Sequence, residues 1–374
     1  METAEQLREA DQGQDLFKIH GTHHIEFYVG NAKQAAYFYR RAMGFALTGY
    51  CGPETGVRDR ASYLLEQGKV RLVLTTPINP ENPMADHIYK HGDGVRDIAI
   101  HVEDAEEAYR IATERGARGV MEPTETSDAN GTVKIATVAT YGDTVHSFVE
   151  RRNYNGPFLP NFAPRQDSLA APIGLKHVDH VVGNVDWNKM EETVNFYKNV
   201  FGFSRFVSFD DKDISTEYSA LRSTVVANEN KWIKFPINEP AEGLKKSQIE
   251  EYVKFYQGAG VQHIAIECQD ILQAIATMRE NGVDFMVVPG SYYDDLQARV
   301  GDIQESIEDL RKLNILVDSD DKGYMLQIFT RPLEDRPTLF FEFIQRRGGE
   351  SFGKGNFKAL FEAIERDQAE RGNL

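Results

Sequence analysis

The sequence lacks the features that mark secreted and membrane proteins. Only two of its 374 residues are cysteine, too few for a disulfide framework, which indicates a reducing compartment. No run of about 18 apolar residues occurs, so we expect no membrane-spanning segment. The first 17 residues, METAEQLREADQGQDLF, contain no apolar stretch of the kind found in signal peptides. These absences together predict a cytoplasmic protein.

Basic charge is also scarce. Lys and Arg number 42 against 58 Asp and Glu, which gives a formal net charge of −16. A field of this sign repels phosphate backbones, so nucleic acid is not expected as a partner. The hydrophobic share of 41% is enough for ordinary globular cores, and the length suggests two or three domains.

What the chain does contain is an internal repeat. The segment GVRDIAIHVED at 94–104 returns as GVQHIAIECQD at 260–270, and TVHSFVERR at 144–152 returns as TLFFEFIQRR at 338–347. A repeat of this length is a duplicated domain. The stretch between the copies is rich in Pro, Gly and polar residues, which is typical of a linker. We therefore predict domains at 20–153 and 175–374, joined by a linker at 154–174.

Each copy predicts the same order of elements. A strand, HIEFYV at 24–29 or HVDHVV at 177–182, leads into an amphipathic helix and further strands, and a second strand–helix unit follows. Asp104 and Asp270 stand at the N-cap positions of the helices in these second units. The end of the chain predicts a terminal amphipathic helix, whose apolar residues recur at i, i+3, i+4 and i+7: Phe357, Leu360, Phe361 and Ile364.

Three polar residues of the second copy stand on strands that are otherwise apolar. They are His180, His263 and Glu342. A single histidine on a strand is more often a satisfied core residue than a ligand, and a single carboxylate more often faces solvent or pairs with an arginine. Two imidazoles and one carboxylate together, however, form the set that binds non-haem Fe(II) and leaves adjacent positions open. Structural zinc would require a fourth protein ligand, and no cysteine cluster supplies one.

The first copy offers no such set. When the repeated segments are aligned, the corresponding positions hold Phe27, Asp97 and Phe148. We therefore expect a metal site in the second copy alone, with Asp97 as a relic of a site, a surface residue or an interface residue.

Several motifs of the second copy carry a resemblance to a known family. They are HVDH at 177–180, FPINEP at 235–240, KSQIEEY at 246–252, GAGVQHIA at 258–265, LQIFTRP at 326–332, FFEFIQRRGG at 340–349 and FGKGNFKALFEAIE at 352–365. On these residues the chain resembles the 4-hydroxyphenylpyruvate dioxygenase family along nearly its whole length. The resemblance implies an α+β fold of two tandem vicinal-oxygen-chelate (glyoxalase/extradiol dioxygenase-like) domains, each made of two βαβββ modules that form a half-open barrel, plus a C-terminal helix. In the family the first domain is structural and has no metal.

The resemblance also implies roles for residues. His180, His263 and Glu342 would bind Fe(II), one ion per subunit. The implied substrate pocket has polar residues (Ser223, Asn238, Gln248 and Gln262), a glutamine beside the iron (Gln327) and apolar walls (Phe329, Phe340, Phe352 and Phe357). Strand alternation agrees, because Gln327 and Phe329 share one strand face and Phe340 and Glu342 share another.

The implied reaction converts 4-hydroxyphenylpyruvate and O₂ to homogentisate and CO₂ in tyrosine and phenylalanine catabolism. It combines oxidative decarboxylation, ring hydroxylation and side-chain migration, and the enzyme would be a homo-oligomer, a dimer or a tetramer. Three alternatives remain: a 4-hydroxymandelate synthase, an extradiol ring-cleaving dioxygenase, and a non-enzymatic binding protein of the same fold. The terminal helix is expected to be a lid over the iron site, with Gly353 and Gly355 as possible hinges.

Overall fold

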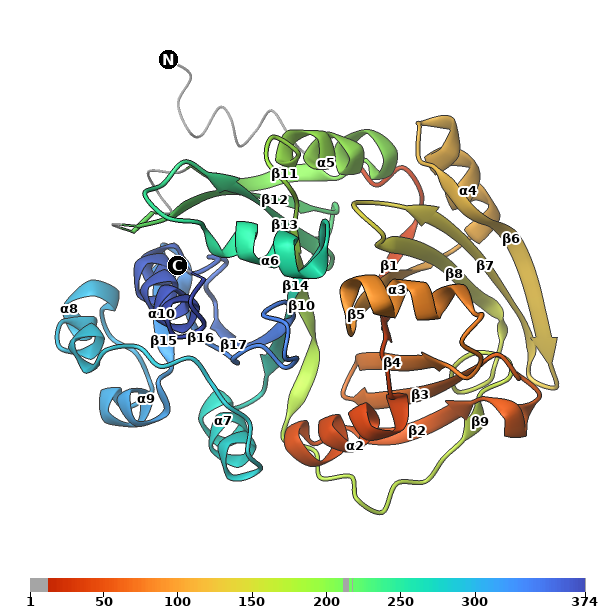
Figure 1. Cartoon of the computed structure of the whole chain (residues 1–374), viewed down its shortest axis with the longest axis horizontal. Coiled ribbons are helices and arrows are strands. Elements are labelled where there is room, and N and C mark those ends of the chain that lie inside the picture. The colour runs from red at the N-terminus through yellow and green to blue at the C-terminus, as the bar shows by residue number, and fades with distance from the viewer. Residues whose placement is uncertain (1–12, 211–214, 217, 374) are drawn as a thin grey trace.

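The computed structural model describes residues 13–210, 215–216 and 218–373. The segment in which we expect no signal peptide therefore falls mostly outside the described residues. Within them, no helix has the length and apolarity needed to cross a membrane. Two large sheets dominate the structure, one from each copy of the repeat (Figure 1).

The first copy forms a nine-stranded sheet in the order β6-β7-β8-β5-β1-β4-β3-β2-β9. Strands β1 and β5 pair antiparallel at its middle, and each also pairs in parallel with the last strand of its own module, β4 or β8. This pattern joins two βαβββ modules. Their elements are β1 (Ile19–Tyr28), α2 (Ala32–Met43), β2 (Ala46–Cys51), β3 (Arg60–Gln67), β4 (Val70–Pro77), then β5 (Gly94–Val102), α4 (Ala105–Glu114), β6 (Gly119–Asp128), β7 (Gly131–Ala139) and β8 (Val145–Tyr154), with α3 (Pro83–His91) between the modules.

The second copy repeats this topology in an eight-stranded sheet, in the order β11-β12-β13-β10-β14-β17-β16-β15. Again an antiparallel pair, β10·β14, joins two modules closed by parallel pairs. The elements are β10 (Leu175–Asn184), α5 (Met190–Phe196), β11 (Ser204–Phe209), β12 (Ala220–Ala227), β13 (Lys234–Ala241), α6 (Gln248–Tyr256), β14 (Gly260–Cys268), α7 (Ile271–Glu280), α8 (Leu296–Val300), α9 (Ile307–Leu313), β15 (Leu316–Asp320), β16 (Gly323–Phe329), β17 (Phe340–Arg347) and α10 (Phe357–Glu370). The predicted α+β fold of two paired-module domains is confirmed.

Local signals in the sequence explain the helix boundaries. The side chain of Asp104 caps α4 by accepting the backbone N–H groups of the first turn, and Asp270 caps α7 in the same way, as predicted. The predicted terminal helix is also confirmed as α10. Among the described residues, the second copy has two helices without a counterpart in the first, α8 and α9, which lie between α7 and β15.

The two sheet faces have different environments because side chains alternate along each strand. On β1, Ile25 and Phe27 belong to the main hydrophobic core, together with Ala36 and Met43 of α2. The neighbouring residue Glu26 points to the opposite, inner face, where it accepts a hydrogen bond from the Thr75 hydroxyl. Helix α2 thus covers the outer face of the first sheet, and Glu26 and Thr75 lie on its inner face.

The inner face of the first sheet is filled by the segment that follows β8. Phe158, 1% exposed, packs on Leu64 and Val73, and Leu159 packs on a second small cluster around Val149. The same stretch adds β9 (Ala163–Pro164) to the sheet edge beside β2. The region predicted as a linker therefore also packs into the first half-barrel and leaves less room there for a ligand.

Candidate metal centre and substrate cavity

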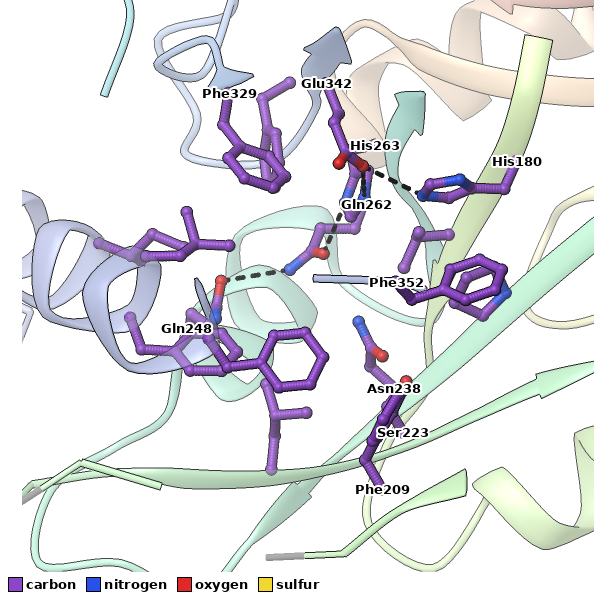
Figure 2. A pocket seen from close by; sticks show the side chains of 18 of the residues that line it. His180, Phe209, Ser223, Asn238, Gln248, Gln262, His263, Phe329, Glu342 and Phe352 are labelled. Carbon is purple, nitrogen blue, oxygen red and sulfur yellow. Dashed lines mark hydrogen bonds and ion pairs between the residues drawn. The ribbon is translucent and has the colours of Figure 1, made fainter. Parts of the chain in front are cut away.

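Three strands of the second sheet bring the predicted metal ligands together. His180 lies on β10, His263 on β14 and Glu342 on β17, and all three face the inner side of the sheet. The Glu342 Oε2 atom lies 3.1 Å from His180 Nε2 and 3.3 Å from His263 Nε2. Figure 2 shows the two imidazoles and the carboxylate turned toward one another at one end of a cavity.

The residue before each histidine fixes which ring nitrogen is free. Asp179 Oδ1 lies 2.8 Å from His180 Nδ1, and Gln262 Oε1 lies 3.0 Å from His263 Nδ1. Each Nδ1–H donates to its neighbour, so Nε2 is the ring nitrogen that can bind a metal ion when the imidazole is neutral. This arrangement is typical of metal-binding histidines, in which a second hydrogen bond orients the ring.

The charges of the three groups also suit a cation. Burial opposes a charge on Glu342, but His180 and His263 together lower the pKa of this carboxyl to about 2. Burial lowers the pKa of His263, which keeps that ring neutral near pH 7. For His180, burial opposes protonation, and the carboxylate of Glu342 raises its pKa. An ionised carboxylate beside imidazole nitrogens is a donor set for a divalent metal ion.

All twelve residues predicted for the site line one cavity. Besides the three ligands these are Ser223, Asn238, Gln248, Gln262, Gln327, Phe329, Phe340, Phe352 and Phe357. Ser223 and Asn238 are opposite each other on β12 and β13, and they lie at the far end of the cavity from the three ligands (Figure 2). Their individual roles stay predictions.

Helix α10 closes the cavity on one side. Its residues Phe357, Leu360, Phe361 and Ile364, the apolar face identified in the sequence, all line the cavity. The helix is tied down by Glu365, which accepts a hydrogen bond from the Ser219 hydroxyl at 2.6 Å, and by Arg371, which pairs with Glu251 at 2.8 Å. The two glycines before α10 are closely packed, since an added Cβ at Gly353 would lie 2.5 Å from the Gln327 side chain.

Sequence reasoning missed several residues of this site. Phe209 lines the cavity from β11 and meets the Phe357 ring edge-to-face at 5.1 Å between centroids. Asp179 is a second such residue. Its position directly before the candidate ligand His180 is the one signal in the sequence that indicates it. Arg346 holds Asp179 from β17, a long-range pairing with no local signal in the sequence.

The strand registers correct the alignment of the two copies. Ala99 pairs with His24 as Ala265 pairs with His180, so the counterpart of His180 is His24 and not Phe27. The counterpart of Glu342 is likewise one residue away from the predicted one. Val145 pairs with Asp97 in the first sheet, and Phe340 pairs with His263 in the second, so Val145 and Phe340 correspond. Ser147 lies two residues after Val145, and Glu342 lies two residues after Phe340. The counterpart of Glu342 is therefore Ser147. The gaps between the copies shifted the sequence alignment by a few residues.

Asp97 is confirmed as the counterpart of His263, but it is not a surface residue. Its side chain is buried, with 6% of the residue exposed, and its Oδ1 accepts the backbone N–H of Ser147 at 2.9 Å. Within the described residues, the groups close enough to hold a metal are His180 with His263 and Glu342, and His177 with Asp179 and Glu267. The second group is neutralised by Lys and Arg side chains that pair with its carboxylates.

Known proteins share this fold and are similar to the chain in sequence. Residues 23–136 and 177–328 match models of the glyoxalase/bleomycin resistance protein/dioxygenase superfamily. The chain is 50% identical to a 4-hydroxyphenylpyruvate dioxygenase of Yarrowia lipolytica over 96% of this chain and 95% of that protein. It is 48% identical to the Dictyostelium discoideum enzyme of the same name, over 95% and 100% of the two chains. A solved mutant of 4-hydroxymandelate synthase from Streptomyces coelicolor superposes with a TM-score of 0.84 at 32% identity, covering 95% of this chain and 100% of that one. With relatives this similar over nearly its full length, the chain belongs to the 4-hydroxyphenylpyruvate dioxygenase family.

Proposed function

We propose that this protein is a 4-hydroxyphenylpyruvate dioxygenase, which converts 4-hydroxyphenylpyruvate and O₂ to homogentisate and CO₂. The observation that carries the proposal is the convergence of His180, His263 and Glu342 at one end of an aromatic cavity, in a chain half identical to enzymes of that name. Hydroxymandelate synthase is the related alternative, but the relatives named as dioxygenases are more similar in sequence.

The metal in this proposal is Fe(II), one ion per subunit. Two imidazoles and one carboxylate suit a divalent ion and leave adjacent positions for an organic chelator and O₂. When bound, the iron supplies the binding point for the 2-oxo acid and the activation of O₂. Zinc in a structural site would take a fourth protein ligand, and the described residues offer none beside these three.

The cavity has few charges of its own. Among its lining residues in the described chain, Glu342 is the one carboxylate, and none is Lys or Arg. A metal dication beside one carboxylate leaves net positive charge, which attracts the anionic head of a 2-oxo acid. The head of the substrate is thus placed at the three ligands by charge, and the aromatic ring extends toward the other end of the cavity.

The remaining lining residues orient the ring and exclude water. Phenylalanines from β11, β16, β17 and α10 form apolar walls, which protect a reactive centre from bulk water. Gln327 is buried, and its Oε1 has no hydrogen-bond partner within the described residues, so it is available to a ligand. Ser223 and Asn238 stand at the far end, where hydroxyl and amide groups suit the phenolic end of the substrate (Figure 2).

The decisive experiment is anaerobic reconstitution with Fe(II), followed by addition of 4-hydroxyphenylpyruvate and O₂ and identification of the product. Homogentisate supports the proposal. Three other outcomes would contradict it. Formation of 4-hydroxymandelate would favour the hydroxymandelate synthase, a ring-opened product would favour the extradiol enzyme, and the absence of any product would favour the binding protein. A variant with Glu342→Ala is the matched negative control.

The finer assignments belong to the same proposal. A cytoplasmic location is supported by the two cysteines, which are both free and buried. A role in tyrosine and phenylalanine catabolism follows from the proposed reaction. The homo-oligomeric state, a dimer or tetramer, is measured by light scattering after gel filtration. We assign a structural role to the first domain, 20–153, because Phe158 of the linker at 154–174 occupies its inner face. The catalytic domain comprises 175–374.

A further inference from the structure

A buried carboxylate holds the first of the three metal-ligand candidates. Asp179 directly precedes His180, and β10 has a bulge between Val178 and His180, where two residues oppose one on β14. A bulge redirects neighbouring side chains. It allows the carboxylate of Asp179 to reach the Nδ1 atom of the next residue at 2.8 Å.

Asp179 is in turn fixed from the other side by an arginine. Its side chain is 3% exposed, and its two oxygens accept hydrogen bonds from Arg346 Nε and Nη2, both at 3.0 Å. Lys234 adds a longer ion pair of 3.4 Å. A two-point arginine–carboxylate pair is geometrically demanding, so Arg346 determines where the Asp179 oxygens lie. Because one of those oxygens accepts the Nδ1–H of His180, Arg346 also sets the orientation of that ring.

The same guanidinium holds the segment that leads into the lid. Arg346 Nη1 donates to the backbone carbonyls of Gly349, at 3.1 Å, and Ser351, at 2.8 Å. The guanidinium also lies over the ring of Phe352, 5.6 Å from its centroid. The Phe352 ring in turn lies 5.2 Å from the His180 ring. The contacts therefore form a closed path from a metal-ligand candidate, through two charged groups and a turn, to the cavity wall that touches the same ligand.

We propose that Arg346 is a positioning residue that couples metal binding to the cavity wall. Through Asp179 it fixes the His180 ring for the metal, and through the carbonyls of residues 349 and 351 it fixes Phe352. The proposal rests on the proposed function only in taking His180 as a metal ligand. The adjacent residue on β17 provides a matched control, because Arg347 bonds the Glu305 side chain, is 40% exposed and has no contact with Asp179.

The first test measures the affinity for Co²⁺, a coloured probe of the metal site, by spectroscopic titration of the metal-free full-length protein. Arg346→Gln and Asp179→Asn are each expected to weaken Co²⁺ binding by about 10–100-fold, the range known for groups that orient metal ligands. Because both substitutions act on the metal through His180, their effects should not add. The double variant should bind Co²⁺ with about the affinity of whichever single variant binds it more weakly. Arg347→Gln should bind as the wild type does.

The second readout is hydrogen–deuterium exchange of the peptide that covers 349–356. Exchange should accelerate in Arg346→Gln, which loses both carbonyl contacts, and much less in Asp179→Asn, which retains them. A purely structural role for Arg346 would not make the exchange at 349–356 differ between the two variants in this way. If Arg346→Gln fails to fold by circular dichroism, Arg346→Lys carries the test, since it keeps the charge but loses the two-point geometry.

The outcomes separate this proposal from the function proposed above. Wild-type Co²⁺ affinity in Arg346→Gln, fully additive effects in the double variant, or unchanged exchange at 349–356 would overturn the coupling while leaving the metal site intact. Failure of the wild-type protein itself to bind Co²⁺, judged against His263→Ala, would instead reject the metal site on which both proposals depend.

Discussion

Replacing Asp97 with asparagine should stabilise the protein at alkaline pH. The Asp97 side chain is buried on the inner face of the first sheet, and it stands across from Glu26 of β1. Burial, reinforced by the charge of Glu26, raises its pKa from the ordinary 3.8 to about 7. A neutral side chain of the same shape avoids the cost of an ionised carboxylate at this position.

The size of the effect follows from this pKa shift. The protonated carboxyl of Asp97 is favoured in the folded state, whose pKa is higher than that of the unfolded chain. Its contribution to the free energy of unfolding is therefore full below pH 3.8 and is lost as the pH rises through 7. The difference between a pKa of 3.8 and one of about 7 corresponds to about 4 kcal/mol of stability that is lost above pH 7. Asparagine avoids this loss and still offers an oxygen to the backbone N–H of Ser147.

The assay is denaturant unfolding of both proteins at pH 5 and pH 8. Asp97→Asn should be more stable than the wild type at pH 8, and the gain should shrink at pH 5. Asp59→Asn, at an exposed carboxylate of the same half, is the control and should show no pH-dependent gain. A variant that is less stable at pH 8, or a gain of equal size at both pH values, would refute the electrostatic argument.

Four further predictions concern the site. Alanine at any one of the three ligand candidates should abolish turnover and lower the iron content measured by metal analysis, whereas Asp97→Ala should leave both intact. Truncation before Phe352 should leave a folded protein with little activity, because the lid helix is lost; circular dichroism and product assay check this, and normal turnover would contradict the lid. Gly353→Ala should lower kcat strongly, because the new Cβ would clash with the Gln327 side chain and because Gly353 has a φ of 79°, which favours glycine. Wild-type kinetics would show that Gln327 need not stay in place. Asn238→Ile should still consume O₂ but release a smaller fraction of homogentisate, since a lost hydrogen bond of about 0.5–1.5 kcal/mol is enough to change a product ratio; an unchanged ratio on chromatography would exclude a role in product choice.

Local signals in the sequence were sufficient to predict the repeated strand–helix units and the terminal helix. The repeated I-A-I strand, the Asp N-caps and the apolar spacing from Phe357 onward depend on neighbouring residues in the chain. The residues placed in the site by motif all line one cavity, and on β16 and β17 strand alternation fixes which side chains share the face toward it.

The part that could not be predicted depends on contacts between distant segments. Arg346 reaches Asp179 across 167 residues of sequence, and Phe209 meets Phe357 from a strand and helix that share no local pattern. The register of the two copies was also missed for His180, because loops of different length separate the repeated segments. A pairing partner on the neighbouring strand decides such a register, and the sequence of one strand does not contain it.

The difference between the two half-barrels lies in what covers their inner faces. Both central strands have a bulge just before the histidine, at Thr22/His24 and at Val178/His180, so the local backbone needed to aim an imidazole inward is present twice. In the first half the His24 ring packs at 5.3 Å against Phe158, and burial lowers its pKa to about 3. In the second half the corresponding space is lined by side chains of α10 and left as a cavity. The same fold thus has a filled inner face in the first half, where a chain segment packs into it, and a cavity in the second half, where helix α10 covers it. The strand positions of His263 and Asp97 correspond, and what surrounds them differs: His263 lines the cavity, whereas Asp97 is buried and bonded to Ser147.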